Sequence, residues 1–384
     1  MTLNKKYWSI YPILEYDAEY NAVLGARTNG KSYGVKKFLL EEAWKDHDKP
    51  ETERAGKFCY IRRYKDDVQQ FLVYGWLKDM VCNKDKKNTI KEITKGKYND
   101  IKISKNGIFF CCYNKEGKET EKPYLIGRYT NIGDAERWKS QSMLDFDYIV
   151  MEEFLASSKP YLPNEPAMLE SLVSTIARER KIKVFLIGNT ESRTCPYFDY
   201  FGLEHVKRQK VGTIDCYEFE TGEFKEDGTP LVIKFAVEYV GEIAGSNGMF
   251  FGIGKDNVGA QWSAKKQPLL TQDELNKYEC IYDMYFIWHG LKWRCELYIG
   301  DMGEFFWFVK PFNKTIYDPY ARVISDKVSV NPYHTINLKP LNKCEQAGFD
   351  VLINGKVFFC DSLTGTEFKR AFDAFQNAIL SSEF

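Results

Sequence analysis

The sequence GARTNGKS at residues 25–32 fits the phosphate-binding pattern G-x-x-x-x-G-K-[ST], which predicts a P-loop between a strand and a helix. In this pattern the glycines let backbone N–H groups approach phosphates, the lysine reaches the β- and γ-phosphates, and the serine hydroxyl ligates Mg²⁺. Lys31 and Ser32 take these two roles here, so Ser32 is a predicted metal ligand. The predicted ATP-binding residues are Gly25, Ala26, Arg27, Thr28, Asn29, Gly30, Lys31 and Ser32.

The residues around this loop supply the context that a P-loop needs. Residues 21–25 (NAVLG) are predicted to form a short buried strand, and residues 31–46 a helix with one apolar face. Further buried strands are predicted at 58–63, 145–151 and 182–188, with a helix at 166–178. Strands that alternate with helices predict an α/β fold with a mostly parallel sheet. We therefore predict a P-loop ATPase domain of the ASCE type over residues 1–203.

The character of the sequence changes after this first half. Residues 204–212 (EHVKRQKVG) are polar and basic, and we predict a linker there. Aromatic, alternating strands are then predicted at 216–220, 232–240, 282–288, 292–299 and 304–309, followed by a helix at 366–380. This pattern predicts an α+β domain with an antiparallel sheet over residues 213–384.

Composition and charge limit the classes of function. The chain has 384 residues with 54 basic and 54 acidic side chains, so any surface that binds nucleic acid must be local. Ten cysteines without a CxxC pair indicate reduced thiols in a cytosol-like compartment. The four histidines lie far apart, which gives a zinc site no support. No apolar run reaches the roughly 20 residues that a membrane span needs.

The segment YIVMEEF at 148–154 is the second motif that carries chemistry. Four apolar residues before two carboxylates are typical of a Walker B strand. Glu152 is then the predicted Mg²⁺ ligand, acting through water, and Glu153 polarises the attacking water. The usual first acid is Asp, and Glu152 is one methylene longer, which alters the metal geometry. The alternative is a pair of surface acids at a strand end.

Basic residues form two further candidate sites. In ARERKIK at 177–183, Arg178 and Arg180 are candidates for an arginine finger that reaches the next subunit's γ-phosphate, or else a solvated face. Asn189 follows a predicted strand, where a polar residue can sense the γ-phosphate. In FCYIRRYK at 58–65, the cationic side chains suit contact with a phosphate backbone, or a solvated strand end. The candidates for DNA binding are Arg62, Arg63 and Lys65.

The order and spacing of these motifs resemble one family. GARTNGKSY, FCYIRRYK, YIVMEEF, YLPNE at 161–165, the arginine run and CPYF at 195–198 resemble the DNA-encapsidation ATPases of small podophages of the protein-primed, packaging-RNA type, which are related to terminase large subunits. The resemblance covers roughly residues 10–203.

The resemblance implies a role for each matching position. It implies that residues 25–32 bind ATP with Arg27 as the loop arginine, and that Glu152 stands at the family's metal-coordinating Asp. The remaining implied roles are the catalytic acid at Glu153, the trans-acting arginine finger at Arg178, a second trans-acting basic residue at Lys139, and a DNA-gripping residue at Lys65.

The resemblance also implies an RNase H-like fold for the C-terminal half, which is a nuclease in the larger relatives. Such a nuclease needs carboxylates around two metals, the first midway along the first strand. The predicted first strand, MYFIWHG at 284–290, contains no acid. Asp283 precedes it, and Asp301 and Glu304 lie at the next turn. We therefore expect a vestigial domain that binds DNA, RNA or the portal without cutting.

These inferences predict an ATP- and Mg²⁺-dependent motor that moves double-stranded viral DNA into a preformed phage capsid. By resemblance it acts as a homo-oligomeric ring, a pentamer, with ATP sites completed between subunits. The expected partners are DNA, the portal or prohead and a packaging RNA, in the host cytoplasm and transiently at the portal vertex. The alternatives are another P-loop enzyme, such as a helicase or small-molecule kinase, and a nucleotide-regulated scaffold that binds DNA or capsid protein.

Overall fold

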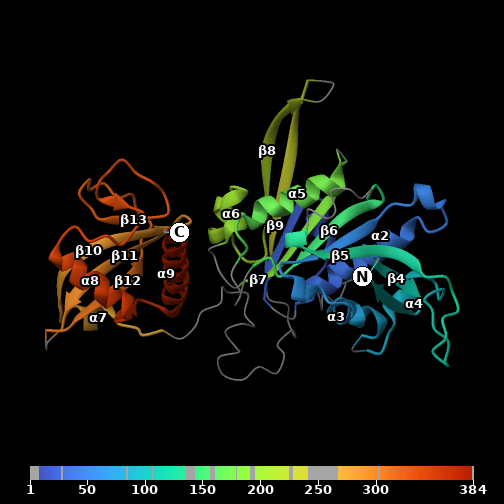
Figure 1. Cartoon of the computed structure of the whole chain (residues 1–384), viewed down its shortest axis with the longest axis horizontal. Helices are drawn as coiled ribbons and strands as arrows, with labels where there is room; N and C mark the ends of the chain where they lie inside the picture. The colour runs from blue at the N-terminus through green and yellow to red at the C-terminus, as the bar shows by residue number, and fades with distance from the viewer. Residues whose placement is uncertain are drawn as a thin grey trace. The chain divides into compact units, whose positions relative to one another are not determined.

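A computed structural model describes residues 8–26, 29–83, 85–105, 107–134, 143–155, 161–178, 180–190, 195–224, 228–240, 267–300 and 303–382. The chain divides into two compact units (Figure 1). The first takes in the described residues up to 190 together with 200–240, and the second takes in 195–199 and 267–382. No helix in the described part of the chain has the length and apolarity to span a membrane.

A nine-stranded sheet forms the centre of the first unit, in the order β3-β4-β5-β2-β6-β7-β1-β9-β8. The six strands from β5 to β9 in this order run parallel, and antiparallel pairs lie at both edges. The strands are β1 Tyr20–Gly25, β2 Lys57–Arg62, β3 Asp100–Ser104, β4 Gly107–Cys111, β5 Tyr124–Asn131, β6 Phe146–Glu152, β7 Lys183–Asn189, β8 Ile214–Phe224 and β9 Pro230–Val240. This confirms the prediction of an α/β fold with a mostly parallel sheet.

Helices cover this sheet through apolar faces. The main helices of the unit are α1 Tyr11–Leu14, α2 Lys31–Lys45, α3 Gln70–Val81, α4 Thr89–Ile93 and α5 Glu165–Ala177, and α6 Pro196–Tyr200 lies at the unit boundary. Val35, Leu39 and Leu40 of α2 are fully buried in the core. Burial of such a side chain is worth about 1.5–3 kcal/mol, so α2 is fixed firmly on the sheet behind the P-loop.

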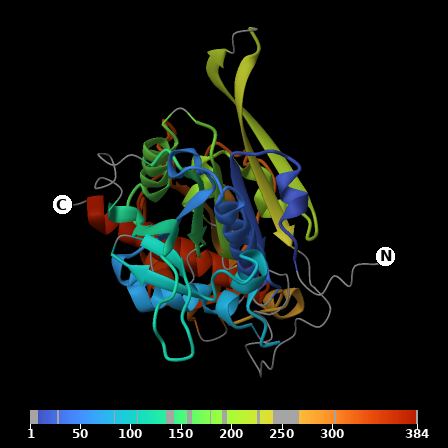
Figure 2. The same ribbon diagram turned by 90° about the vertical axis from the view of Figure 1, so that its right-hand side faces the viewer.

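The strands β8 and β9 correct the predicted domain boundary. Residues 204–212 and the strands after them were expected to lie outside the ATPase domain, but β9 pairs in parallel with β1 and β8 pairs with β9. The physical reason is that β1 has one free edge, which β9 completes. The outer half of this hairpin is exposed and extends beyond the rest of the unit (Figure 2).

The second unit has its own six-stranded sheet, in the order β14-β13-β10-β11-β12-β15. The strands β10, β11 and β12 are antiparallel, β13 runs parallel to β10, β14 parallel to β13, and β15 parallel to β12. The elements are α7 Gln272–Leu275, β10 Glu279–Trp288, β11 Leu291–Ile299, β12 Phe305–Pro311, β13 Val323–Ser325, β14 His334–Thr335, α8 Lys343–Ile353, β15 Val357–Phe359 and α9 Ser362–Ser382. Phe368, Phe372 and Phe375 of α9 pack on Phe286 of β10.

Candidate nucleotide-binding site

The loop between β1 and α2 has the backbone that a P-loop needs. Gly30 caps α2 with a φ of 86°, a left-handed conformation that favours glycine. A side chain at Gly25 would bring its Cβ to 3.0 Å from the Cβ of Val240, so the loop also leaves the sheet in a crowded place. Arg27 and Thr28 lie outside the described residues. The N-terminus of α2 therefore points its unpaired N–H groups into the loop, which favours an anion.

Lys31 is buried inside this loop. Its Nζ donates to the carbonyl oxygens of Gly25 at 3.1 Å and Ala26 at 2.6 Å, and to Oδ1 of Asn29 at 3.0 Å. Burial lowers the pKa of Lys31 to about 8, while the charge of the Glu152 carboxylate acts in the opposite direction. A phosphate would compete with these three uncharged acceptors, and it would favour the charged ammonium more strongly than they do.

The predicted acids lie at the end of β6. Glu152 is the last residue of that strand, and its Oε1 accepts a hydrogen bond from Nε1 of Trp76 at 3.1 Å. Glu152 pairs in register with Ile187 of β7, and Ile187 pairs with Val23 of β1, two residues before Gly25, so this carboxylate and the loop begin at the same edge of the sheet. An ammonium, a hydroxyl at Ser32 in the first turn of α2 and a carboxylate are the donor set that Mg²⁺ and nucleotide phosphates require. The residues present therefore fit both groups.

Glu153 follows the strand with a left-handed backbone, at a φ of 57°. Its Oε2 pairs with Nη2 of Arg62 at 2.6 Å, and its side chain is 59% exposed. The strands β2 and β6 are adjacent, so residues 62 and 153 emerge from neighbouring strand ends. Arg62 was predicted as a DNA contact, and the structure instead brings it to the predicted catalytic acid.

The side chain of Arg63 is buried and paired within the protein. Its side chain is 7% exposed, its Nε pairs with Oε2 of Glu165 at 2.7 Å, and its Nη2 donates to the carbonyl of Phe154 at 2.7 Å. The guanidinium also lies 4.7 Å from the centre of the Tyr161 ring. The predicted DNA contact by Arg63 is therefore corrected, because burial and these partners keep the guanidinium away from a ligand. Lys65 is exposed, just after β2.

The two candidate finger arginines differ in their surroundings. Arg180 pairs with Asp147 at 2.8 Å, and its Nη2 donates to the carbonyls of Met143 and Ile176 at 3.1 Å each. Arg178 is exposed and ends α5 in a left-handed conformation, at a φ of 42°. Lys139 lies outside the described residues.

Asn189 was predicted to follow a strand, and the structure makes it the last residue of one. It ends β7, directly opposite Gly25 in the parallel pairing of β1 and β7. The backbone N–H of the next residue, Thr190, donates to the carbonyl of Gly25 at 3.3 Å. The backbone of Asn189 therefore lies beside the first residue of the P-loop. This position suits a side chain that senses bound phosphate.

Two tryptophans contribute to the site without a sequence signal. Trp76 contacts Glu152, as described above. Trp8 donates its backbone N–H to the carbonyl of Asn29 at 3.0 Å and its Nε1–H to Glu238 at 2.9 Å. Burial raises the pKa of Glu238 to about 7, and the Trp8 hydrogen bond opposes this shift. No motif marks either tryptophan, because each acts through a residue that is distant in sequence.

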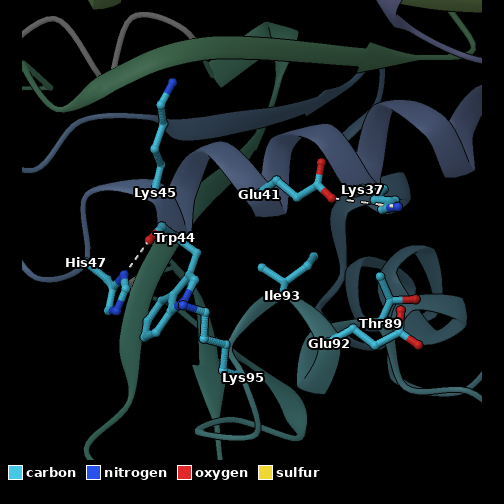
Figure 3. Close-up of a pocket in the computed structure, with 9 residues that line it drawn as sticks. All are labelled: Lys37, Glu41, Trp44, Lys45, His47, Thr89, Glu92, Ile93 and Lys95. Carbon is cyan, nitrogen blue, oxygen red and sulfur yellow. Dashed lines mark hydrogen bonds and ion pairs between the residues drawn. The ribbon is translucent and has the colours of Figure 1, made fainter.

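A separate pocket of about 390 Å³ lies between α2 and α4 (Figure 3). Lys37 and Glu41 form an ion pair at 3.7 Å on its wall, and Nδ1 of His47 contacts the carbonyl of Trp44 at 2.7 Å. The pocket contains none of the predicted site residues, so the nucleotide site is not this cavity.

Acidic residues of the second unit form ion pairs with neighbouring basic residues. The structure corrects one expectation, because β10 begins at Glu279 and Asp283 therefore lies inside the strand. Asp283 stands opposite Glu296 and pairs with Arg294 at 2.9 Å, and Glu296 pairs with Lys310 at 2.8 Å. Asp301 lies outside the described residues. Within the described ranges, no three metal-binding side chains gather.

The first half of the chain is similar to a known protein family and to individual phage proteins. A family model for the podovirus DNA encapsidation protein (Gp16) matches residues 4–218. The DNA packaging protein of Bacillus phage B103 is 28% identical over 194 residues, which are 50% of this chain and 50% of that protein. The DNA packaging protein of Bacillus phage phi29 is 26% identical over 194 residues, 50% of this chain and 48% of that protein. The matched region is thus about half the length of these relatives.

Solved structures show a likeness in fold. A chain of the bacteriophage Phi-29 viral genome packaging motor assembly is 16% identical, with a TM-score of 0.50 over 96% of this chain and 99% of that chain. The N-terminal domain of the DNA packaging ATPase from bacteriophage phi29 is 21% identical, with a TM-score of 0.43 over 62% of this chain and 98% of that chain.

Proposed function

The chain belongs to the podovirus DNA encapsidation protein (Gp16) family, and from this membership we propose that it is an ATP-hydrolysing motor that moves double-stranded viral DNA into a phage capsid. One observation carries the proposal at the level of chemistry. The loop that holds the buried Lys31 follows β1, and Glu152 ends β6 with Glu153 directly after it, at the same edge of the sheet. Loop and acids come from separate strands of one parallel sheet, as in enzymes that hydrolyse nucleotides.

Each residue of this site has a distinct task. The N–H groups at the start of α2 and the Lys31 ammonium bind the phosphates, and Ser32 and Glu152 would hold the Mg²⁺ that neutralises phosphate charge. Glu153 orients the attacking water and accepts its proton. Arg62 holds Oε2 of the Glu153 carboxylate at 2.6 Å, and a carboxylate has a second oxygen that can accept a hydrogen bond from water.

We further propose that the site is completed by a second copy of the chain in a homo-oligomeric ring, a pentamer. Arg178 is the trans-acting finger in this proposal, and Lys139 is a second basic residue from the neighbour. Exposure supports the choice, because Arg178 is exposed, whereas the Arg180 side chain is only 28% exposed. A finger of this kind contributes about 10³–10⁵ in rate in other NTPases.

The DNA contact is proposed for Lys65. It is exposed, whereas Arg62 and Arg63 are held by Glu153 and Glu165. Contacts to phosphates carry no base information and weaken with salt, so the grip should be independent of sequence and sensitive to salt. A net charge of zero is consistent with basic groups that are confined to the DNA path.

The second unit is proposed to be RNase H-like and without nuclease activity. Its three antiparallel strands β10, β11 and β12, followed by β13 parallel to β10 and β14 parallel to β13, have the strand order of such sheets. Asp283 and Glu296 are paired with Arg294 and Lys310, which leaves them poorly suited to hold two metals. Portal or prohead and a packaging RNA are the proposed partners, in the host cytoplasm and at the portal vertex.

The decisive experiment compares Glu153→Gln with Lys31→Ala in the full chain. We expect Glu153→Gln to bind ATP and to lose turnover by about 10²–10⁴, the usual contribution of a general base. Lys31→Ala should lose binding itself. Glu41→Gln on the exposed side of α2 is a matched control that should change neither. Unchanged turnover in Glu153→Gln would leave a nucleotide-regulated scaffold, and turnover that DNA and proheads do not stimulate would favour a kinase-like enzyme.

The proposal that Arg178 acts in trans is tested by mixing. Lys31→Ala subunits keep their arginine and Arg178→Ala subunits keep their P-loop, so a mixed ring contains some complete sites. We expect activity in the mixture and little in either variant alone. Failure to recover activity at every ratio would count against a finger at Arg178.

A further inference from the structure

The carboxylate of Glu152 has a defined partner outside the predicted motifs. Its Oε1 accepts a hydrogen bond from Nε1 of Trp76 at 3.1 Å, across 76 residues of sequence. Glu152 ends β6, and Trp76 lies in the middle of α3. An indole can donate one hydrogen bond and accept none, so this contact has one direction. The second carboxylate oxygen, Oε2, is left for other ligands.

Aromatic side chains of β2 hold the ring of Trp76 in place. Its ring stacks on Tyr60 of β2 at 4.1 Å between centres and 24° between planes, and it meets Phe58 edge to face at 6.2 Å. Tyr60 pairs in register with Val150 of β6, two residues before Glu152. Aromatic pairs of this kind contribute beyond the area they bury. The indole thus has a fixed position relative to the end of β6.

Helix α2, which follows the P-loop, also holds Trp76 through its backbone. Nζ of Lys36 donates to the backbone carbonyl of Trp76 at 2.8 Å and pairs with Asp79 of α3 at 2.6 Å. Lys36 is 5% exposed, so this ion pair is shielded on the lysine side. It follows Lys31 by five residues on α2. One rigid helix therefore carries both the phosphate-binding lysine and the anchor of the tryptophan that contacts Glu152.

This arrangement accounts for a Glu in place of the usual Asp. A glutamate side chain has one more rotatable bond than aspartate and loses more conformational freedom when it is fixed. Resting on the proposed ATPase function, we propose that Trp76 is a positioning residue for Glu152, whose indole N–H fixes one carboxylate oxygen and leaves the other for the Mg²⁺ of the nucleotide. Aspartate at this position would draw the carboxylate back by one methylene and lose the indole.

The test is the Mg²⁺ dependence of nucleotide binding in Trp76→Phe, with a fluorescent non-hydrolysable ATP analogue as the probe. Phenylalanine keeps a ring on Tyr60 and removes the N–H donor. We expect the Mg²⁺ concentration at half-saturation to rise about tenfold, the size expected for a lost hydrogen bond to a charged group. Affinity for the analogue in EDTA should change by less than about twofold. A general loss of packing would weaken both.

A double-mutant cycle with Glu152→Asp sharpens the test. The aspartate cannot reach the indole, so Trp76→Phe added to Glu152→Asp should have no further effect on Mg²⁺ dependence. Trp44→Phe, in the same core and remote from Glu152, is the control for loss of an indole and should match the parent chain. Additive effects, or a Trp76→Phe chain with parental Mg²⁺ dependence, would overturn the proposal.

A second variant covers the case in which Trp76→Phe does not fold. Replacing Trp76 by 3-benzothienylalanine exchanges the N–H for sulfur and keeps the bicyclic shape, and the same tenfold shift is expected. Failure of the nucleotide site on which the proposed function depends has a different signature. The parent chain would then bind no Mg²⁺-dependent nucleotide, and Lys31→Ala would change nothing.

Discussion

Arg62, Arg63 and Lys65 are close in sequence, yet the structure gives them three different environments. Arg62 is paired with an exposed acid, Arg63 is buried, and Lys65 is exposed. The difference follows from local structure, because Arg62 is the last residue of β2, Arg63 lies just beyond the strand, and Lys65 begins a short 3₁₀ helix. At the scale of single residues, a cluster of positive charge in sequence is therefore not a cluster in space.

Arg63→Ala should lower stability rather than weaken DNA binding. It would leave Glu165, which is 0% exposed, without its charged partner, and breaking a buried ion pair costs about 3–5 kcal/mol. Lys65→Ala is the matched control, because an exposed side chain changes stability by less than about 0.5 kcal/mol. Urea unfolding measures the stability of both variants. DNA affinity at two salt concentrations measures how each substitution affects DNA binding. An Arg63→Ala chain of full stability would contradict the structural role.

At the scale of elements, the contact of β7 with the segment after β6 sets the position of Glu153. A Cβ at Gly188 would lie 2.8 Å from Phe154 and 3.1 Å from Leu155. The backbone N–H of Phe154 also donates to the carbonyl of Ile187 at 3.3 Å. The chain just past the proposed catalytic acid is thus packed directly on the adjacent strand, and Gly188 is small because this approach is close.

Gly188→Ala should displace this segment and impair hydrolysis more than binding. Overpacking costs about 1–3 kcal/mol, and a shift of about 1 Å at a catalytic group can cost about 10²-fold in rate. Gly75→Ala on α3 is the control, since nothing lies within 4 Å of its Cβ and alanine should stabilise the helix by about 1 kcal/mol. Steady-state hydrolysis and nucleotide affinity are measured together. Equal losses in both would place the defect in general folding.

Glu238 of β9 makes the stability of the first unit depend on pH. Its pKa is raised by burial to about 7, against 4.5 as the ordinary value. Below pH 4.5 the group is protonated in both the folded and the unfolded chain, so it adds no pH dependence to stability there. Between pH 4.5 and 7 the unfolded chain loses this proton first, so the contribution of Glu238 to stability falls and then levels off above pH 7.

Glu238→Gln should remove this fall, because glutamine does not titrate in this range. The variant should therefore gain stability relative to the parent chain as pH rises from 5 to 8. Urea unfolding at several pH values measures the difference between the two chains, which cancels the titration of all other groups. A difference that stays constant across this range would show that Glu238 keeps its ordinary pKa.

What the sequence predicted depends on how local each feature is. The P-loop is contiguous, and the strands at 21–25, 145–151 and 182–188 are mostly apolar because parallel strands are buried on both faces. The pairing of β9 with β1 joins residues that are more than 200 positions apart, and no local pattern encodes it. The contacts of Glu152 with Trp76 and of Glu153 with Arg62 are equally non-local.

At the scale of the whole molecule, the described chain contains two separately built cores. Leu39, Val150 and Phe185 belong to the core of the first unit, and Phe286 and Trp307 to that of the second. The P-loop and both acids lie in the first unit. The unit proposed to bind nucleotide is therefore distinct from the unit proposed to bind portal or RNA, so separate mutations should change the two proposed activities.

Nucleotide should stabilise only the unfolding transition of the first unit. A ligand at 100 times its Kd adds about 2.7 kcal/mol to the unit that binds it. The transitions are assigned by Leu39→Ala, which costs about 2–5 kcal/mol in the first core, and by Trp307→Ala, which costs about 3–5 kcal/mol in the second. Calorimetry with and without a non-hydrolysable ATP analogue and Mg²⁺ gives the shifts, and Lys31→Ala should abolish the one in the first transition. If the analogue raised both transitions equally, or Trp307→Ala lowered both, the two cores would unfold as one cooperative body.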